Sequence, residues 1–366
     1  MKIQVQAAQL AEALSWILPA IKRNPTMPVL TGAMVTADED SLTVAAFDYD
    51  LAMKATIPAL VSERGQCLVG GRVLRDLSAR MNGDVALVAA GSSLTLTCGR
   101  SNYDLGLMPT TDYPTIRTEA PEVGQVDAAT LLAALHRIEP SIGAPDIPLT
   151  VLRGVHLVAE DGTLRMDASD RYRIARATTP YDGKPFDLTP DGKILIDIVK
   201  GLAGRLTLGI DDTRLVIADD ARAAAINVMG DDFPKFDTVI DSVGDEFRAS
   251  FERDDLLAAL GRLDQIAEKK TDPIVLAFHL DGHCEVRSHD NDSRRSGVEL
   301  IDCESTHDSS VAFNPHYLAD ALKVHTAETV ALRNSDPKTQ FKPTQIVGDD
   351  GVITIVTPIN LRKRVS

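Results

Sequence analysis

Four residues in the last third of the chain have side chains that could bind a metal ion: His279, His283, Cys284 and His289. Imidazole nitrogens and cysteine thiolates are common ligands of Zn²⁺. The spacing places them on a predicted hairpin, in which His279 and His283 share a face. The pattern lacks the compact ligand pair of most zinc sites, however, and is more typical of polar strand and turn residues. We therefore predict no metal ligands in the chain.

The other groups that could do chemistry are isolated from one another. The carboxylate pairs Asp211–Asp212 and Asp219–Asp220 fall at predicted strand ends, where solvated turn residues are common. His136 and His316 fall on predicted helices and are more typical of surface or rim residues than of catalytic bases. The sequence contains no G-x-x-x-x-G-K-[ST], H-E-x-x-H or G-x-S-x-G motif and no glycine fingerprint after a strand. We predict no catalytic residue and no cofactor, and an enzyme with a charged substrate groove is the weakest alternative.

The elements that would position any site repeat along the chain. The segment LLAALGRL at 256–263 recurs as LLAALHRI at 131–138 and, less closely, as LAEALSWI at 10–17. In all three, apolar residues recur at i, i+4 and i+7, which indicates one buried face of a helix. The copies lie 121 and 125 residues apart, close to one third of the 366 residues. The chain therefore reads as three copies of one unit.

Each copy continues with similar signals. A proline and an apolar strand follow the first helix, and a hairpin turn comes next, Asp161–Gly162 in the second copy and Asp281–Gly282 in the third. Second helices are predicted over 72–81, 196–206 and 314–325, the last with Asn314 as N-cap. Each copy thus reads as β-α-β-β-β-α-β-β-β, an α+β fold with two helices beside a sheet. The predicted domains are residues 1–120, 125–243 and 246–366.

Composition excludes some classes of protein. The chain has 44% hydrophobic and 25% charged residues, as globular domains do, and no apolar run approaches the roughly 18 residues of a membrane span. The four cysteines form no C-x-x-C pair, and the N-terminal residues read as a strand rather than a signal peptide, which favours a cytoplasmic protein with reduced thiols. The net charge of −15 argues against binding nucleic acid by bulk electrostatics.

Positive charge nevertheless gathers on the predicted helices. The six windows 7–24, 71–82, 128–140, 196–206, 255–270 and 314–326 hold twelve Lys and Arg against eight Asp and Glu, so the rest of the chain carries −19. Amphipathic helices often carry Lys and Arg, so this count alone also fits a plain solvated surface. If all six helices lie on one side, they would form a mildly basic lining suited to a polyanion. Weak contacts with the phosphates of the polyanion would let it slide.

Several dispersed motifs resemble one family over the full length of the chain. They are LMPTTDYP at 107–114, VLRGV at 151–155, ASDRYRIA at 168–175, DFPKF at 232–236 and FNPHYL at 313–318. In this order they resemble the beta subunit of bacterial DNA polymerase III, the sliding clamp. The resemblance implies a head-to-tail homodimer that closes into a ring, with helices lining the hole and sheets outside. It also implies a protein without enzymatic activity that encircles double-stranded DNA.

The resemblance implies two sets of binding residues. Cations on the helices would face DNA without reading its sequence, and they are Lys22, Arg23, Arg72, Arg137, Lys200 and Arg205. A cleft would bind short peptides of the polymerase III alpha subunit, the clamp loader and other proteins with a clamp-binding motif. Its residues are Leu152, Ser169, Arg171, Arg173, Ile174, Pro234, Val239, Asn314, Tyr317, Val356, Pro358, Ile359 and Leu361. From the residues alone, Leu152 and Val239 would be read as core.

The C-terminus departs from the family pattern. The family usually ends near Met-Pro-Met-Arg-Leu or Met-Pro-Val-Arg-Leu, whereas this chain reads TPINL at 357–361 and continues with RKRVS at 362–366. A flexible methionine of the cleft is thus replaced by the smaller, partly polar Thr357. We expect peptide binding to be retained but altered. The alternative to a housekeeping clamp is a specialised second copy that escapes a peptide antibiotic or serves a dedicated polymerase.

Overall fold

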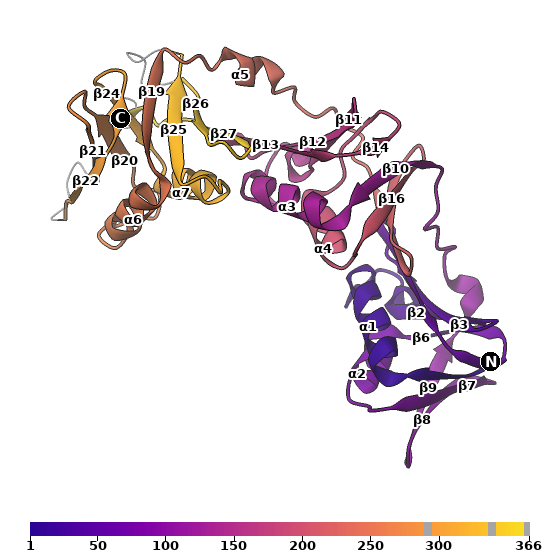
Figure 1. Ribbon diagram of the computed structural model, residues 1–366. Coiled ribbons are helices and arrows are strands. Elements are labelled where there is room, and N and C mark those ends of the chain that lie inside the picture. The colour runs from indigo at the N-terminus through magenta and orange to yellow at the C-terminus, as the bar shows by residue number, and fades with distance from the viewer. Residues whose placement is uncertain (289–294, 336–341, 362–366) are drawn as a thin grey trace. The chain divides into compact units, whose positions relative to one another are not determined.

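The computed structural model describes residues 1–288, 295–335 and 342–361 (Figure 1). The chain divides into two compact units. Unit 1 consists of Met1–Ala129, Asp182–Lys184 and Asp197–Val228, and unit 2 contains the rest of the described chain. The three predicted domains remain a prediction.

Three successive stretches of chain run through the same elements: a strand, a helix, five strands, a second helix and three strands. The α+β class predicted from the sequence is confirmed. The predicted order was wrong in one respect, because it had three strands rather than five between the helices. The additional strands include β14 (Asp182–Gly183) and β15 (Phe186–Leu188), which are too short to show an alternating pattern.

Unit 1 contains one sheet of fourteen antiparallel strands in the order β14-β10-β16-β17-β18-β4-β3-β2-β6-β9-β8-β7-β1-β5. Its strands besides β14 are β1 (Lys2–Gln6), β2 (Gly32–Asp38), β3 (Ser41–Phe47), β4 (Leu51–Pro58), β5 (Leu60–Glu63), β6 (Gly65–Gly70), β7 (Asp84–Ala90), β8 (Ser93–Cys98), β9 (Ser101–Met108), β10 (Glu122–Asp127), β16 (Arg205–Ile210), β17 (Arg214–Ala218) and β18 (Arg222–Asn227). Pairing of β18 with β4 makes the sheet continuous.

Unit 2 contains two antiparallel sheets. The nine-stranded sheet has the order β15-β11-β12-β13-β27-β26-β25-β19-β23, and the four-stranded sheet has the order β22-β21-β20-β24. Their strands besides β15 are β11 (His156–Glu160), β12 (Thr163–Ser169), β13 (Arg173–Pro180), β19 (Phe247–Glu252), β20 (Ile274–Phe278), β21 (His283–Ser288), β22 (Val298–Asp302), β23 (Glu304–Ser305), β24 (Ser309–Phe313), β25 (Thr329–Asn334), β26 (Thr344–Val347) and β27 (Ile353–Val356).

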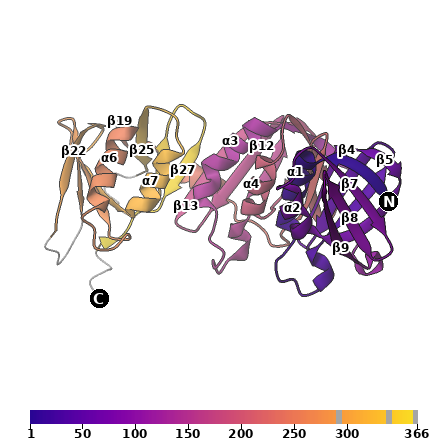
Figure 2. The same ribbon diagram turned by 90° about the horizontal axis from the view of Figure 1, so that it is seen from below.

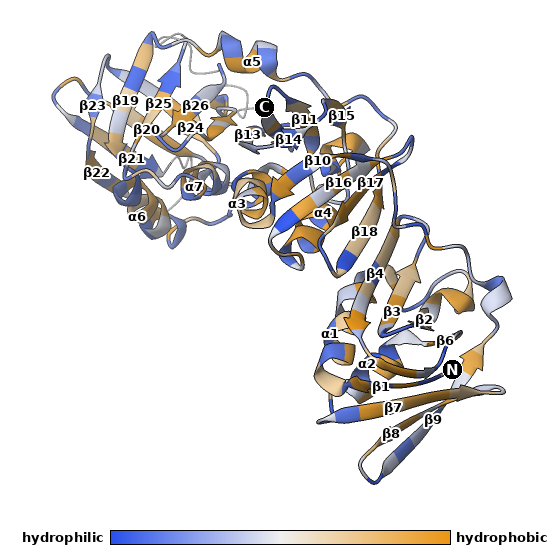
Figure 3. Ribbon diagram, turned by 45° about the vertical axis from the view of Figure 1, so that its right-hand side comes forward, coloured by the Kyte–Doolittle hydropathy of each residue, from blue (hydrophilic) through white to orange (hydrophobic). Residues whose placement is uncertain are grey.

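The helices bury one apolar face each. They are α1 (Ala7–Ile17), α2 (Gly71–Ser78), α3 (Ala128–Ile138), α4 (Gly192–Lys200), α5 (Asp237–Ser242), α6 (Arg253–Asp264) and α7 (Pro315–Lys323). In unit 1, α1 packs against α2, and in unit 2, α6 packs against α7 (Figure 2). The repeated apolar spacing explains this packing, because Leu256, Leu260 and Leu263 of α6 are all buried. In Figure 3 the ribbon of α6 carries hydrophilic as well as hydrophobic residues. No helix in the described ranges has both the length and the apolar character to cross a membrane.

The boundaries of α4 differ from the prediction. The helix begins at Gly192, after Asp191, whose carboxylate accepts hydrogen bonds from two backbone N–H groups of the first turn. It ends at Lys200, and Gly204 follows with φ +70°, a left-handed conformation that glycine adopts readily. Arg205 is therefore the first residue of β16 and does not lie on the fourth helix.

Of the two predicted hairpin turns, the one in the second copy agrees with the sequence and the one in the third copy differs. Asp161 and Gly162 have φ of 50° and 76°, as expected for a type I′ turn between β11 and β12. The turn near Asp281 is different: His279 N–H donates to the His283 carbonyl, which leaves a three-residue loop rather than two. The predicted cap of α7 is confirmed, because the Asn314 side chain accepts from the N–H groups of His316 and Tyr317.

Candidate functional site

A pocket of about 320 Å³ opens in unit 2 where β13 meets β27. Aliphatic, proline and aromatic side chains form most of its wall, and a few polar groups lie among them. The lining residues are Leu149, Leu152, Ser169, Arg171, Tyr172, Arg173, Ile174, Pro234, Phe236, Val239, Pro343, Ile355 and Thr357. An apolar pocket with a few fixed polar groups is the usual form of a site for a small molecule or a peptide anchor.

Segments far apart in the sequence build this pocket. Ile174 of β13 is the ladder partner of Ile355 of β27, so the two side chains lie side by side on one face of the sheet. Leu152 comes from a short 3₁₀ helix (Thr150–Arg153), and Val239 comes from α5. The pocket thus depends on the pairing of the second and third stretches of chain, which occurs inside unit 2.

The turn between β12 and β13 holds an unusual backbone conformation. Arg171 has φ of 79°, in the left-handed region that residues other than glycine seldom adopt. The Ser169 hydroxyl fixes the turn by donating to the Arg173 carbonyl at 2.7 Å and accepting from the Arg171 N–H at 3.2 Å. The Asp170 carboxylate accepts from the Tyr172 and Arg173 N–H groups. Such strain of about 1–3 kcal/mol is found most often at functional sites.

Arg173 is held on three sides beside the pocket. Its guanidinium donates to Asp170 at 2.9 Å and to Asp320 of α7 at 3.0 Å. It also lies 4.5 Å above the ring of Tyr317, which in turn stacks on Tyr172. These contacts fix a cation and the Tyr172 ring at the pocket rim, with Tyr317 behind them, and the rim groups could orient a polar ligand backbone.

Seven of the thirteen residues predicted for peptide binding line this pocket: Leu152, Ser169, Arg171, Arg173, Ile174, Pro234 and Val239. The other six do not line it. Asn314 caps α7, Tyr317 stacks behind the rim, and Val356 is buried in the core of unit 2. Pro358, Ile359 and Leu361 follow β27, where the Ile359 N–H bonds to the Ala312 carbonyl.

Sequence reasoning missed several lining residues. Leu149, Phe236, Pro343 and Ile355 were not predicted, although Phe236 ends one of the recognised motifs. Cross-strand partners share a face of the sheet, so Ile355 could have been found from Ile174 if the register had been known. The sequence of either strand alone does not determine the register of two strands that are so distant in the chain. Thr357 does line the pocket, as its replacement of a methionine suggested, and its N–H bonds to the Tyr172 carbonyl. The segment 362–366 lies outside the described residues.

The cations predicted to contact DNA lie in different surroundings. Lys22 and Arg23 follow α1 rather than lying on it, and Lys22 pairs with the buried carboxylate of Asp48 at 3.3 Å. Arg72 of α2 donates to the Ile21 carbonyl. In unit 1, Lys200 is half exposed, 4.0 Å from Asp197.

Two more of these cations are committed to protein partners. Arg205 pairs with Asp182 at 2.7 Å and bonds to Gln125. Arg137 of α3 donates to the Asp350 carbonyl at 2.8 Å and to the Thr326 hydroxyl. The structure thus brings no cluster of free cations together within either unit from these six residues.

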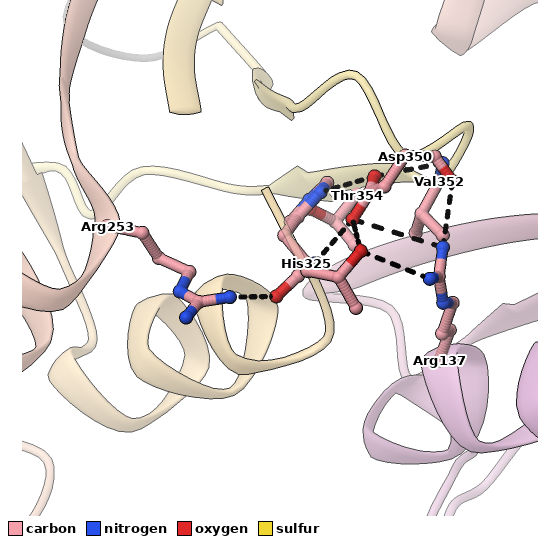
Figure 4. A network of polar contacts seen from close by, with 7 residues as sticks. Arg137, Arg253, His325, Asp350, Val352 and Thr354 are labelled. Atoms are coloured by element: carbon pink, nitrogen blue, oxygen red, sulfur yellow. Dashed lines mark hydrogen bonds and ion pairs between the residues drawn. The ribbon is translucent and has the colours of Figure 1, made fainter. Parts of the chain in front are cut away.

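Arg137 belongs to a polar network inside unit 2 (Figure 4). His325, which is only 1% exposed, lies 3.1 Å from Asp350 through Nδ1 and 3.0 Å from Thr354 through Nε2. Burial lowers the pKa of His325 and outweighs the effect of Asp350, so the ring is neutral at pH 7. Burial acts against the charged form of Asp350, but bonds from Thr326 N–H and His325 hold its pKa below the usual range. The network ties α3 to the loop between β26 and β27.

The other candidate catalytic groups have structural roles or lie alone. Asp211 accepts from Arg214, which lowers the pKa of its carboxyl, and Asp219 accepts from the N–H groups of its own turn. His136 is exposed on α3, and His316 lies 3.6 Å from Asp264. Nothing in this arrangement resembles a nucleophile with its base.

Sliding clamps are among the solved structures that share this architecture. The DNA polymerase sliding clamp from Bacillus subtilis matches with a TM-score of 0.90 at 18% identity, over 98% of this chain and 99% of that chain. The DNA polymerase III beta subunit from Pseudomonas aeruginosa bound to griselimycin also gives 0.90, at 20% identity, over 99% and 100%. The chain therefore has the DNA clamp fold.

Sequence comparison leads to one family. The DNA polymerase III beta subunit N-terminal domain matches residues 1–117, and the C-terminal domain of the same subunit matches residues 245–359. The beta sliding clamp of Streptomyces coelicolor is 27% identical over 96% of this chain and 95% of its own length. The beta sliding clamp homolog GriR of Streptomyces muensis is 25% identical over 88% of each. This chain belongs to the DNA polymerase III beta subunit family.

Proposed function

We propose that this protein is a DNA sliding clamp, a processivity factor that encircles duplex DNA and tethers a polymerase and repair proteins to it. The observation that carries the proposal is the match of nearly the whole chain to proteins that are named sliding clamps. The protein acts by topology rather than by catalysis, and it works in the cytoplasm. No cofactor is needed for this role.

The pocket at β13 and β27 is the site for partner peptides. Its partners are the polymerase III alpha subunit, the clamp loader and other proteins that carry a clamp-binding motif. Leu152, Ile174 and Val239 offer an apolar wall for a leucine or aromatic anchor, and each such side chain buried gains about 1.5–3 kcal/mol. Arg173 and the Ser169 turn lie at the rim, where they meet the polar backbone of the peptide.

Two sheet edges support a head-to-tail homodimer. In unit 2, β22 has β21 as its one ladder partner among the described residues, and its Val298 and Leu300 are 60% and 67% exposed. In unit 1, β9 pairs with β6 through Leu107 and Met108, and within the described part of the chain residues 101–105 have a ladder partner on one side alone. Exposed edges with apolar side chains invite pairing with another chain. In a dimer, β22 of each copy would pair with β9 of the other copy, and these two contacts together close a ring.

Contact with DNA is weak and independent of sequence. The net charge of −15 opposes tight binding, so closure around the duplex must keep the protein attached. Of the predicted DNA-facing cations, Arg23 is exposed and Lys200 is half exposed. These two are the side chains that we propose touch phosphates, whereas Arg137 and Arg205 serve the fold.

Retention on DNA of different topology tests the proposal. The protein is loaded by its clamp loader onto nicked circular DNA and separated from free protein by gel filtration. We expect co-elution with the circle and loss within minutes after one restriction cut. Blocking both ends of the linear product should restore retention. Equal retention on open linear and circular DNA, or none on circles, would contradict a sliding clamp.

A second candidate is a specialised clamp with an altered pocket. The observation that favours it is Thr357, which lines the pocket where the family usually has methionine. Such a copy would escape a peptide antibiotic or serve a dedicated polymerase. Two measurements separate the candidates: whether this gene alone supports replication, and whether the protein binds griselimycin. Replication that depends on this gene together with tight binding would eliminate the specialised copy.

A further inference from the structure

The hairpin of β20 and β21 brings two imidazoles and a carboxylate together in unit 2. His279 follows β20, and its ring stacks on that of His283 with the centroids 4.5 Å apart. Glu285 lies two residues beyond His283 on the same strand, so both side chains point to one face of the sheet. The ligand atoms that the three residues offer all lie within 4.8 Å of one another.

The polar atoms of this cluster are not fully used by the fold. The Nε2 atom of His279 is buried and has no hydrogen-bond partner in the described part of the chain. Buried polar atoms nearly always have a partner, so an orphan of this kind points to a missing ligand or ion. His283 is already oriented, because its Nδ1 lies 2.6 Å from the Asp281 carboxylate. That contact occupies one ring nitrogen and leaves the opposite one as the atom that could bind a metal, as in metal sites where a carboxylate orients the histidine ligand.

The third side chain is held only loosely. The Glu285 carboxylate has Arg287 at 3.6 Å through one oxygen, a weak and partly exposed pair. Cys284 cannot join the cluster, because it is 0% exposed and points to the other face of the strand. His289, which was considered with these residues from the sequence, lies outside the described residues.

We propose that His279, His283 and Glu285 bind one divalent transition-metal ion, with zinc as the representative. Two neutral imidazoles and one carboxylate are the three protein ligands of many zinc sites, and water takes the fourth position. Magnesium and calcium are disfavoured because they prefer oxygen ligands throughout. Ligand atoms around zinc lie about 3.4 Å apart, so small side-chain rotations close the present spacing.

This site revises the sequence interpretation, which discounted a metal here. The sequence placed His279 and His283 on one face of a hairpin but showed no compact ligand pair, and the three-residue loop that sets the two residues opposite each other was not predicted. Glu285 was not considered. Bound metal would join the two strands beside the loop, and its affinity would fall in acid because the imidazoles must be deprotonated. The site does not depend on the proposed clamp function.

Metal titration of the full-length, untagged protein tests the site. After treatment with chelator, the protein is titrated with ZnCl₂ in a calorimeter at about pH 7.5. We expect one ion per chain, and at least about tenfold weaker binding for His283→Ala. His136→Ala is the matched control, because it removes an exposed imidazole from α3 and should change nothing. MgCl₂ alone should give no saturable heat.

Cobalt spectroscopy identifies the ligands. Co²⁺ bound to the parent should show visible d–d bands without the thiolate charge-transfer band that a surface cysteine such as Cys98 would add. Glu285→Gln should shift these bands, and it provides a milder variant if an alanine substitution unfolds the hairpin. Unchanged zinc affinity in His283→Ala and Glu285→Gln, or no stoichiometric binding by the parent up to about 1 mM, would overturn the proposal.

Discussion

Two regions of unit 2 join the same two stretches of chain, 130–181 and 342–361, in opposite ways. Around Ile174 and Ile355 the junction is hollow, with apolar walls and a strained turn at Arg171. Around His325 and Asp350 it is filled by polar groups that bond to one another. The filled junction has the character of a structural joint, and the hollow one has the character of a binding site.

The difference shows how one interface can serve stability and recognition together. Buried polar groups cost free energy unless each is paired, and in the network Arg137, His325 and Asp350 are paired. The pocket instead leaves apolar surface to be covered by a ligand. We therefore expect changes in the network to affect folding, and changes in the pocket to affect peptide binding with little effect on folding.

The largest effect should come from Asp350→Ala. This change removes the carboxylate that bonds to His325 and to the Thr326 N–H, whereas Arg137 keeps its bond to the carbonyl of residue 350. We expect a loss of about 3 kcal/mol in the free energy of unfolding, because buried polar groups lose their partner. Chemical denaturation of the full chain measures it. Asp349→Ala removes the neighbouring exposed carboxylate and is the matched control. A loss below about 1 kcal/mol for Asp350→Ala would show that the network is not a structural joint.

The next largest effect should be on peptide binding by Val239→Asp. A carboxylate in the apolar wall would have to be desolvated by the ligand, so we expect at least about 100-fold weaker binding of a clamp-binding peptide. Fluorescence anisotropy measures the affinity. Thr238→Asp adds the same charge at the adjacent, exposed position of α5 and should keep the parent affinity. If both variants bind equally well, the pocket is not the peptide site.

Thr357→Met should act in the opposite direction. The longer, flexible side chain adds apolar contact at the pocket, and we expect about fivefold tighter peptide binding, or about 1 kcal/mol. Thr357→Val keeps the size of threonine and separates the loss of the hydroxyl from the gain in length. Equal affinities for Thr357→Met and the parent would mean that this departure from the family is neutral.

Acid should weaken the network. The pKa of His325 is lowered in the fold, so the unfolded chain binds a proton more readily. The stability that His325 contributes is present above its ordinary pKa of 6.5 and is lost as pH falls through the lowered value. We expect the free energy of unfolding to drop as the pH falls below about 6.5. His325→Gln should flatten this dependence, whereas His136→Gln should not, and the reverse pattern would assign the titration elsewhere.

The smallest effect should come from Arg171→Gly. Glycine adopts positive φ without strain, which favours the folded state. It also raises the conformational entropy of the unfolded chain, so the net gain in stability should be at most about 1 kcal/mol. Peptide binding should weaken at the same time, because the pocket loses a wall. Thermal denaturation and peptide anisotropy together check both signs. A loss of stability would show that the Arg171 side chain, rather than its backbone, holds the turn.

Most of the local structure could be predicted from the sequence, but little of how the helices and strands pack together could be. Periodicity located α1, α3 and α6, and Asn314 and Asp161–Gly162 marked a cap and a turn, because these signals act within a few residues. Arg205 was misplaced because Gly201 and Gly204 break the helix before it. Ile355 was missed because its register with Ile174 is set by pairing between residues 181 positions apart in the chain.

The most direct test of the account is an electron-microscopy image of the purified protein, with its mass in solution known. The account predicts a particle of two chains with a central opening wide enough for duplex DNA. A single chain, or a two-chain particle with no opening, would contradict it.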